Sequence, residues 1–232
     1  MISGLPSTFR SVVVDTWVSI QASNRSATNI ASSVAQTHRV HLLDLNDGVT
    51  NLGVAALQLL VSREGFAPTT WDVRQAHQLP PDDATPWVLT GGPGSPLSEG
   101  PWRAPLLAAL AARIRGARPT LGICYGFELM ALVAGGELRL LRAPRQGTYP
   151  LALLGPDPWL TDLHAACAYE SRSWGAFGGE GEVLATGPEG DVAAMRFGPG
   201  VCGVIFHPEA DIGPDTRRVY ASVLPRYLAN LR

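Results

Sequence analysis

Residues 120–133 read TLGICYGFELMALV. The first four form a short apolar run typical of a buried strand, and the residues after Cys124 favour a helix. Gly122 and Gly126 flank Cys124 at a spacing of two, which predicts a strand-to-helix turn too tight for Cβ atoms. Such a turn projects the central side chain outward and leaves the first helical N–H groups unpaired. Because those N–H groups and the helix dipole favour a thiolate, Cys124 is a candidate nucleophile, the alternative being an inert core cysteine.

Strand-like and helix-like segments alternate on either side of this turn. Apolar or β-rich runs predict strands at 40–45, 69–73, 87–90 and 201–206. Helical periodicity predicts helices near 54–61, with Asn51 as a candidate cap, from Pro101 to about residue 115, and at 215–231. Shorter β-rich runs lie at 138–141, 149–154, 166–169, 181–185 and 192–197. The pattern predicts an α/β fold: a mainly parallel sheet with helices on both faces, plus antiparallel hairpin additions in the second half.

Composition narrows the class of protein. Of 232 residues 46% are hydrophobic and only 16% charged, which excludes an intrinsically disordered chain. A formal charge of −2 offers no basic surface, so we expect no nucleic-acid partner and no membrane partner. Three cysteines do not make a disulfide framework, and with no apparent signal peptide they predict a cytoplasmic location. Residues 1–38 are interpreted as an N-terminal extension and residues 39–232 as one domain.

Two further loops contain candidate catalytic residues. After Thr90 come Gly91 and Gly92, where the backbone can approach a ligand closely and turn an N–H toward an oxyanion. His207 ends a predicted strand and Glu209 follows two residues later, which is what a base and its orienting carboxylate require. Taken alone, each is a weak signal, because a plain turn or a solvated histidine has the same composition. All three loops follow predicted parallel strands, at the edge where ligands bind in such sheets.

In this order the segments LTGGP (89–93), LGICYG (121–126) and FHPE (206–209) resemble the class I glutamine amidotransferases, over residues 40–231. The resemblance implies Cys124 as nucleophile, His207 as base and Glu209 as its orienting acid. It also implies an oxyanion hole formed by the backbone N–H groups of Gly92 and Tyr125. The substrate's amino-acid end is expected at residues 170–174, with substrate-binding contacts from Ser171 and Arg172.

One position departs from the family pattern. The family usually has C-x-G-x-Q, whereas this chain has Glu128 in place of the glutamine that helps to position the substrate. An ionised Glu128 cannot donate a hydrogen bond and opposes the thiolate at Cys124. It could pair with Arg145 or Arg172, or suit a substrate with a cationic or donor group. The alternative is a carboxylate on the helix surface.

The resemblance implies amide hydrolysis through a Cys thioester intermediate, with ammonia as product and glutamine or an analogue as substrate. No cofactor is expected, and no metal site, since Cys167 and Cys202 lack ligands at suitable spacing and are expected to be core thiols. A separate synthase subunit is a possible acceptor of the ammonia. Two alternatives stay open: a hydrolase or transferase of γ-glutamyl or other small amides with the same triad, and a non-catalytic binding subunit of the same fold.

Overall fold

The structure is a computed structural model that describes residues 38–48, 53–161, 163 and 166–231. The predicted extension therefore lies outside the described residues except for His38, with which the first strand begins. Asn51, the predicted helix cap, also lies outside them. The described N-cap of that helix is Gly53, which has a φ of 81°.

The central feature is an eight-stranded mixed sheet, in the order β2-β1-β3-β4-β10-β9-β8-β6. The first five strands run parallel: β2 (Phe66–Asp72), β1 (His38–Asp44), β3 (Trp87–Leu89), β4 (Thr120–Ile123) and β10 (Val201–Val204). The other three are antiparallel to their neighbours: β9 (Val192–Gly198), β8 (Glu182–Thr186) and β6 (Ala152–Leu153). The predicted mainly parallel sheet with antiparallel additions is confirmed.

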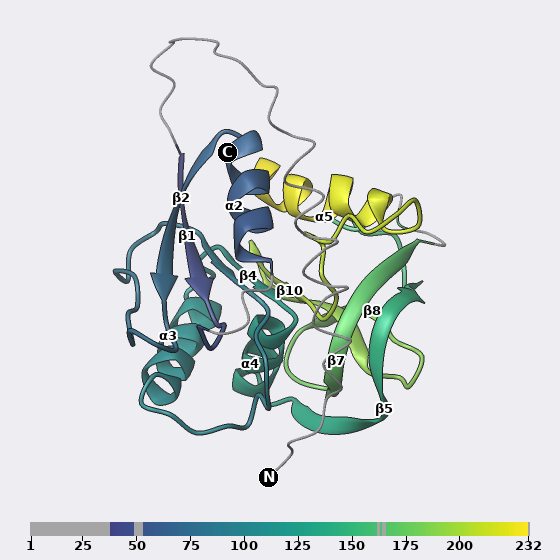
Figure 1. The fold of residues 1–232 in the computed structure, drawn as a ribbon, viewed down its shortest axis with the longest axis horizontal. Coiled ribbons are helices and arrows are strands. Elements are labelled where there is room, and N and C mark those ends of the chain that lie inside the picture. The colour runs from purple at the N-terminus through teal and green to yellow at the C-terminus, as the bar shows by residue number, and fades with distance from the viewer. Residues whose placement is uncertain (1–37, 49–52, 162, 164–165, 232) are drawn as a thin grey trace. The chain divides into compact units, whose positions relative to one another are not determined.

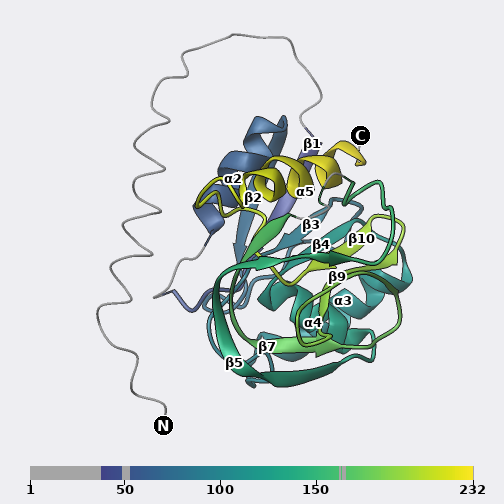
Figure 2. The same cartoon turned by 90° about the vertical axis from the view of Figure 1, so that its right-hand side faces the viewer.

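Helices cover both faces of this sheet. α2 (Val54–Arg63) and α5 (Arg217–Ala229) lie on one face, and α3 (Arg103–Arg115) and α4 (Tyr125–Val133) on the other (Figures 1 and 2). Because successive side chains of a strand point to opposite faces of the sheet, one strand contributes to the apolar clusters on both faces. In β1, Val40 and Leu42 join one apolar cluster, while Leu43 joins the second.

A separate two-stranded ribbon differs from the sequence prediction. β5 (Glu137–Pro150) is one long strand where two short ones were predicted, and its partner β7 (Cys167–Phe177) continues well beyond residue 169. A register shift between Leu140 and Arg145 absorbs the irregular stretch around Pro144. The proline is tolerated because, among the residues that the structure describes, β5 pairs with β7 alone and its other edge is free. Charged residues and proline hide the strand pattern in the sequence.

Three neighbouring strands position the candidate catalytic residues. β3, β4 and β10 lie side by side and parallel, so their carboxyl ends meet at one edge. Thr90, Cys124 and the segment that leads to His207 follow those ends. Across the described part of the chain, none of the helices has the length and apolar character needed to cross a membrane.

Candidate active site

Cys124 sits on a strained turn between β4 and α4. Its φ of 50° and ψ of −109° are rarely adopted by a residue with a side chain, and its N–H donates to the Val204 carbonyl at 2.8 Å. A Cβ at Gly122 would lie 2.6 Å from Met130 Sδ, and one at Gly126 would lie 2.5 Å from Leu89 Cβ. Both glycines are therefore required by close packing, as the sequence predicted. Strain of this kind persists where the surrounding structure holds a functional group in place.

His207 and Glu209 form the second part of the site. His207 Nδ1 lies 2.8 Å from Glu209 Oε1, with both side chains buried. The backbone N–H of His207 donates to the Tyr169 carbonyl at 2.9 Å, which ties the histidine to β7. Within the described residues, His207 Nε2 is buried without a hydrogen-bond partner. The carboxylate therefore orients the imidazole and leaves one nitrogen available for chemistry.

Gly91 lies where Cys124 and His207 come together. A Cβ built there would lie 2.9 Å from His207 Cε1 and 3.6 Å from Cys124 Cβ, so the two side chains approach the same backbone. Burial lowers the pKa of His207, but the negative charges of Cys124 and Glu209 outweigh it and raise that pKa well above its ordinary value. The geometry favours an imidazolium beside the sulfur.

The backbone of Gly92 and Tyr125 adjoins this point. Neither N–H donates a hydrogen bond to another described residue. Tyr125 directly follows Cys124 as the first residue of α4, and the first N–H groups of a helix have no intrahelical acceptor. A Cβ at Gly92 would lie 2.4 Å from the Leu45 carbonyl oxygen, so only glycine permits this approach. Two free donors beside a nucleophile can bind an oxyanion.

Glu128 is buried, with 3% of its surface exposed, so the alternative of a surface carboxylate on the helix is wrong. Burial raises its pKa to about 8, although the positive charges of Arg172 and His207 oppose the rise. No ion pair joins Glu128 to Arg145 or Arg172 within the described residues. Glu128 therefore favours its neutral, protonated form at pH 7, in which it can donate a hydrogen bond.

The predicted substrate segment 170–174 lies in β7, where its residues alternate in direction. Ser171 is half-buried, whereas Glu170 and Arg172 are buried. Arg172 Nε donates to Glu170 Oε2 at 2.7 Å and Nη1 to the Trp174 carbonyl at 2.7 Å, and a third nitrogen pairs with Asp191. These bonds hold the Arg172 side chain inside the fold.

Sequence reasoning missed one neighbour of the triad. An ideal Cβ at Gly53 would lie 2.5 Å from Glu209 Oε1, so the start of α2 packs directly against the carboxylate. The positive end of a helix dipole stabilises a carboxylate at such a position. A glycine ahead of a helical pattern was the one available signal, and it does not identify the partner.

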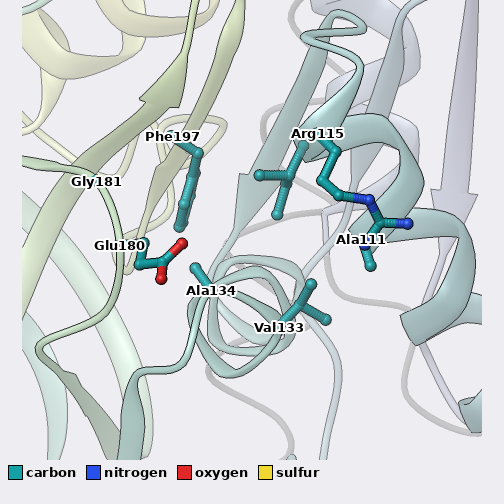
Figure 3. A pocket seen from close by; sticks show the side chains of 8 residues that line it. Ala111, Arg115, Val133, Ala134, Glu180, Gly181 and Phe197 are labelled. Atoms are coloured by element: carbon teal, nitrogen blue, oxygen red, sulfur yellow. The ribbon is translucent and has the colours of Figure 1, made fainter.

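A cavity of about 340 Å³ lies elsewhere (Figure 3). Arg115 of α3, Val133 at the end of α4, Glu180 and Phe197 are among the residues that line it. Cys124 precedes the first residue of α4, so this cavity is at the opposite end of that helix and contains none of the predicted site residues. Among the residues described by the structure, no cluster of three or more His, Cys, Asp or Glu could hold a metal ion.

Comparison with known proteins identifies similar chains. Residues 41–224 match the family described as "Glutamine amidotransferase class-I". GMP synthase [glutamine-hydrolyzing] of Aeropyrum pernix is 36% identical over 125 residues, which are 53% of this chain and 23% of that protein. The enzyme of the same description from Mycobacterium leprae is 29% identical over 192 residues, 76% of this chain and 34% of that protein. The match thus spans between about a quarter and a third of these relatives.

Solved structures agree on the fold. A glutamine amidotransferase from Thermotoga maritima superposes with a TM-score of 0.66 at 17% identity, covering 79% of this chain and 80% of that one. A glutamine amidotransferase from Methylobacillus flagellatus has a TM-score of 0.66 at 16% identity, covering 82% of this chain and 76% of that one.

Proposed function

We propose that this chain, which belongs to the glutamine amidotransferase class-I family, hydrolyses the side-chain amide of glutamine and releases ammonia. The observation that carries the proposal is the meeting of Cys124 and His207 at Gly91, with Glu209 at 2.8 Å behind the imidazole. A nucleophile, a base and an orienting acid in that arrangement are what acyl transfer requires.

In the first half of the reaction, the Cys124 thiolate attacks the amide carbonyl carbon, and the carbonyl oxygen becomes an oxyanion. The N–H groups of Gly92 and Tyr125 are the proposed donors to it, and one such donor is worth on the order of 3 kcal/mol. When the tetrahedral intermediate collapses, the C–N bond breaks and His207 gives its proton to the leaving nitrogen. The raised pKa of His207 supports this role, because it favours the imidazolium that donates the proton.

In the second half, water replaces ammonia beside His207. The neutral imidazole accepts a proton from that water as its oxygen attacks the thioester carbon. Collapse of the second tetrahedral intermediate breaks the C–S bond, which releases glutamate and returns the sulfur as a thiolate. The sum is glutamine plus water to glutamate plus ammonia, and this chain's own residues supply each proton transfer.

For the substrate's amino-acid end, we propose contacts from the half-buried Ser171 and from Glu128. Arg172, also predicted to bind substrate, acts in this proposal through its charge and by holding β7, because Glu170, Trp174 and Asp191 occupy its donors. A protonated Glu128 presents an O–H donor beside a carbonyl acceptor, much as a glutamine amide presents N–H donors beside its carbonyl, so it is compatible with free glutamine as substrate.

A second candidate substrate class is a γ-glutamyl compound or another small amide, cleaved by the same triad. The buried carboxyl group of Glu128 is the observation that favours it, since the positive charge of an amine on such a substrate would lower the raised pKa of Glu128 and pair with the carboxylate. Assaying glutamine and γ-glutamyl amines side by side distinguishes the two substrate classes. Both react at the same Cys124, so the class with the higher kcat/KM is the preferred substrate.

We also propose a separate synthase subunit as the acceptor of ammonia. Support comes from the named relatives, which are GMP synthases three to four times the matched length. The unpaired state of all three cysteines supports the predicted cytoplasmic location. The test of the partner is glutamine hydrolysis before and after addition of a separately produced GMP synthase amination domain, with a higher rate expected after addition. An unchanged rate contradicts that choice of partner.

The decisive experiment measures ammonia release from glutamine by the wild type and by Cys124→Ala. We expect turnover by the wild type and none above background by the variant, with an unchanged melting temperature. A glutamine-derived diazoketone should label Cys124 once per chain. Labelling by iodoacetamide but not by the diazoketone would favour the γ-glutamyl class, and equal labelling of Cys124, Cys167 and Cys202 would favour a non-catalytic subunit.

A further inference from the structure

Arg74 lies in the segment between β2 and β3, far in sequence from each of the three loops of the site. Its side chain is half-buried, and one nitrogen, Nη1, donates to the Pro93 carbonyl at 2.8 Å and to the Leu45 carbonyl at 3.3 Å. A guanidinium suits this task because it is planar and holds several donors in one rigid fork.

Gly92 lies between the two carbonyl groups that Arg74 binds. Pro93 is the next residue in the chain, and the Leu45 carbonyl oxygen would be only 2.4 Å from a Cβ at Gly92. Arg74 therefore joins the backbone directly after Gly92 to the backbone against which Gly92 packs. These two bonds therefore restrain the Gly92 peptide.

The same guanidinium also contacts the side chain of Tyr125, whose backbone N–H is the other proposed oxyanion donor. Its central carbon lies 5.5 Å from the centroid of the Tyr125 ring and 5.4 Å from that of Trp102, a cation–π arrangement. The Tyr125 hydroxyl donates to the Ser95 carbonyl at 3.0 Å, so it fastens the far end of the same glycine loop. Arg74 and Tyr125 together tie the loop 91–95 to the start of α4.

The charge of Arg74 is not cancelled locally. Within the described ranges no carboxylate forms an ion pair with it. A permanent positive charge held against the Tyr125 ring and the Pro93 carbonyl favours negative charge on an oxygen bound nearby, and it acts through a partly buried, less screened environment.

We infer that Arg74 is a positioning residue that holds the Gly92 and Tyr125 N–H groups in register as one oxyanion hole. The inference rests on the proposed function. Loss of Arg74 should therefore impair only the formation and binding of species that carry an oxyanion. The reason is that Arg74 touches neither Cys124 nor His207 in the described contacts.

The test compares the wild type with Arg74→Met and Arg74→Lys. We expect Arg74→Met to lower kcat for glutamine about 10- to 100-fold while KM changes less than about threefold, below the roughly 100- to 1,000-fold loss typical for a deleted donor. Arg74→Lys retains the charge and one carbonyl bond, so it should recover part of the rate.

Two compounds that react with the Cys124 sulfur distinguish a loss of oxyanion-hole positioning from a general disturbance of the active site. The open-chain form of glutamate γ-semialdehyde, which is in equilibrium with its cyclic imine, adds to the thiolate and creates an oxyanion, so its affinity relative to the wild type should fall in parallel with kcat. Iodoacetamide alkylates the sulfur by displacing iodide and forms no oxyanion, so its rate should stay within about twofold of wild type. As a matched control, Arg139→Met removes a stacked arginine, 4.2 Å from the Phe177 ring, and should leave all three readouts unchanged.

The outcomes are distinct. If the wild type neither hydrolyses glutamine nor binds the aldehyde, the proposed function fails. If the wild type does both and Arg74→Met matches it in kcat and aldehyde affinity, the inference about Arg74 is wrong. Slower alkylation by iodoacetamide in Arg74→Met and Arg74→Lys, in proportion to the loss of kcat, would also overturn it, because the damage would then reach the sulfur itself.

Discussion

Glu128 brings a carboxyl group into the protein interior four residues after the nucleophile. The nearby positive charges of Arg172 and His207 do not cancel the effect of burial, because Arg172 is already matched by Glu170 and Asp191 and His207 by Glu209. An additional charge there would be uncompensated, and the proton is retained instead. At the scale of single residues, the protonation state of a side chain thus follows from how its neighbours are paired.

Replacing Glu128 by Gln should change how stability depends on pH. The pKa of Glu128 is about 8 in the folded protein against 4.5 ordinarily, so the folded state holds the extra proton between those values. The wild type should therefore lose stability relative to Glu128→Gln as pH rises from about 4.5 to 8, by at most about 1.4 kcal/mol per pH unit. Denaturant unfolding at pH 5, 6.5 and 8 measures this difference. Parallel stability curves for the two proteins would contradict it.

At the scale of elements, the side chains of His207 and Glu209 pack against glycines, because a residue without a side chain allows a closer approach. Gly91 faces His207, and Gly53 at the start of α2 faces Glu209. These contacts make the α2 terminus part of the support for the triad, although α2 is distant from Glu209 in sequence.

Gly53→Ala should impair catalysis through Glu209. The new Cβ would lie 2.5 Å from Glu209 Oε1, so the carboxylate must move and its 2.8 Å contact with His207 weakens. We expect kcat to fall about 10-fold or more, within the contribution of a positioned base. Gly135→Ala is the matched control, because φ is 81° at Gly53 and 78° at Gly135, yet a Cβ at Gly135 meets nothing within 4 Å.

Both alanine variants should lose about 1–2 kcal/mol of stability from the left-handed backbone, and only Gly53→Ala should lose activity. Steady-state kinetics together with denaturant unfolding separates the two effects. Equal activity in the two variants would show that Glu209 tolerates displacement.

At the scale of the whole domain, a buried ionic network attaches the β5–β7 ribbon to the main sheet. Asp191, the residue directly before β9, pairs with Arg145 of β5 at 2.9 Å and with Arg172 of β7. The ribbon in turn holds His207 through the Tyr169 carbonyl. Burial raises the pKa of Asp191, but the two arginines outweigh it and keep that pKa below its ordinary value.

Asp191→Asn should lower the free energy of unfolding by about 3–5 kcal/mol, because it leaves two buried guanidinium groups short of a partner. Since the depressed pKa makes this contribution present above about pH 3.8 and lost in stronger acid, the deficit should shrink toward pH 3. Asp82→Asn is the control, since the Asp82–Arg118 pair is exposed and worth at most about 1 kcal/mol. Similar losses from both substitutions would argue against the network.

The sequence alone carried the features that have local causes. The strand-to-helix turn at Cys124 and the presence of a mainly parallel sheet were predicted, because two glycines at fixed spacing and apolar periodicity act within a few residues of the chain. The long ribbon was missed because Pro144 and the charges around it are tolerated by a free edge, which is a property of the sheet.

What only the tertiary structure decided is the surroundings of each side chain. The resemblance pointed to Glu128 and Arg172, but their burial and the pairing of Arg172 with Asp191 depend on strands that are distant in sequence. Gly53 beside Glu209 and Arg74 beside Pro93 carried no motif at all. The physical reason is that charge, burial and packing are sums over neighbours in space, and the chain reveals those neighbours only after it has folded.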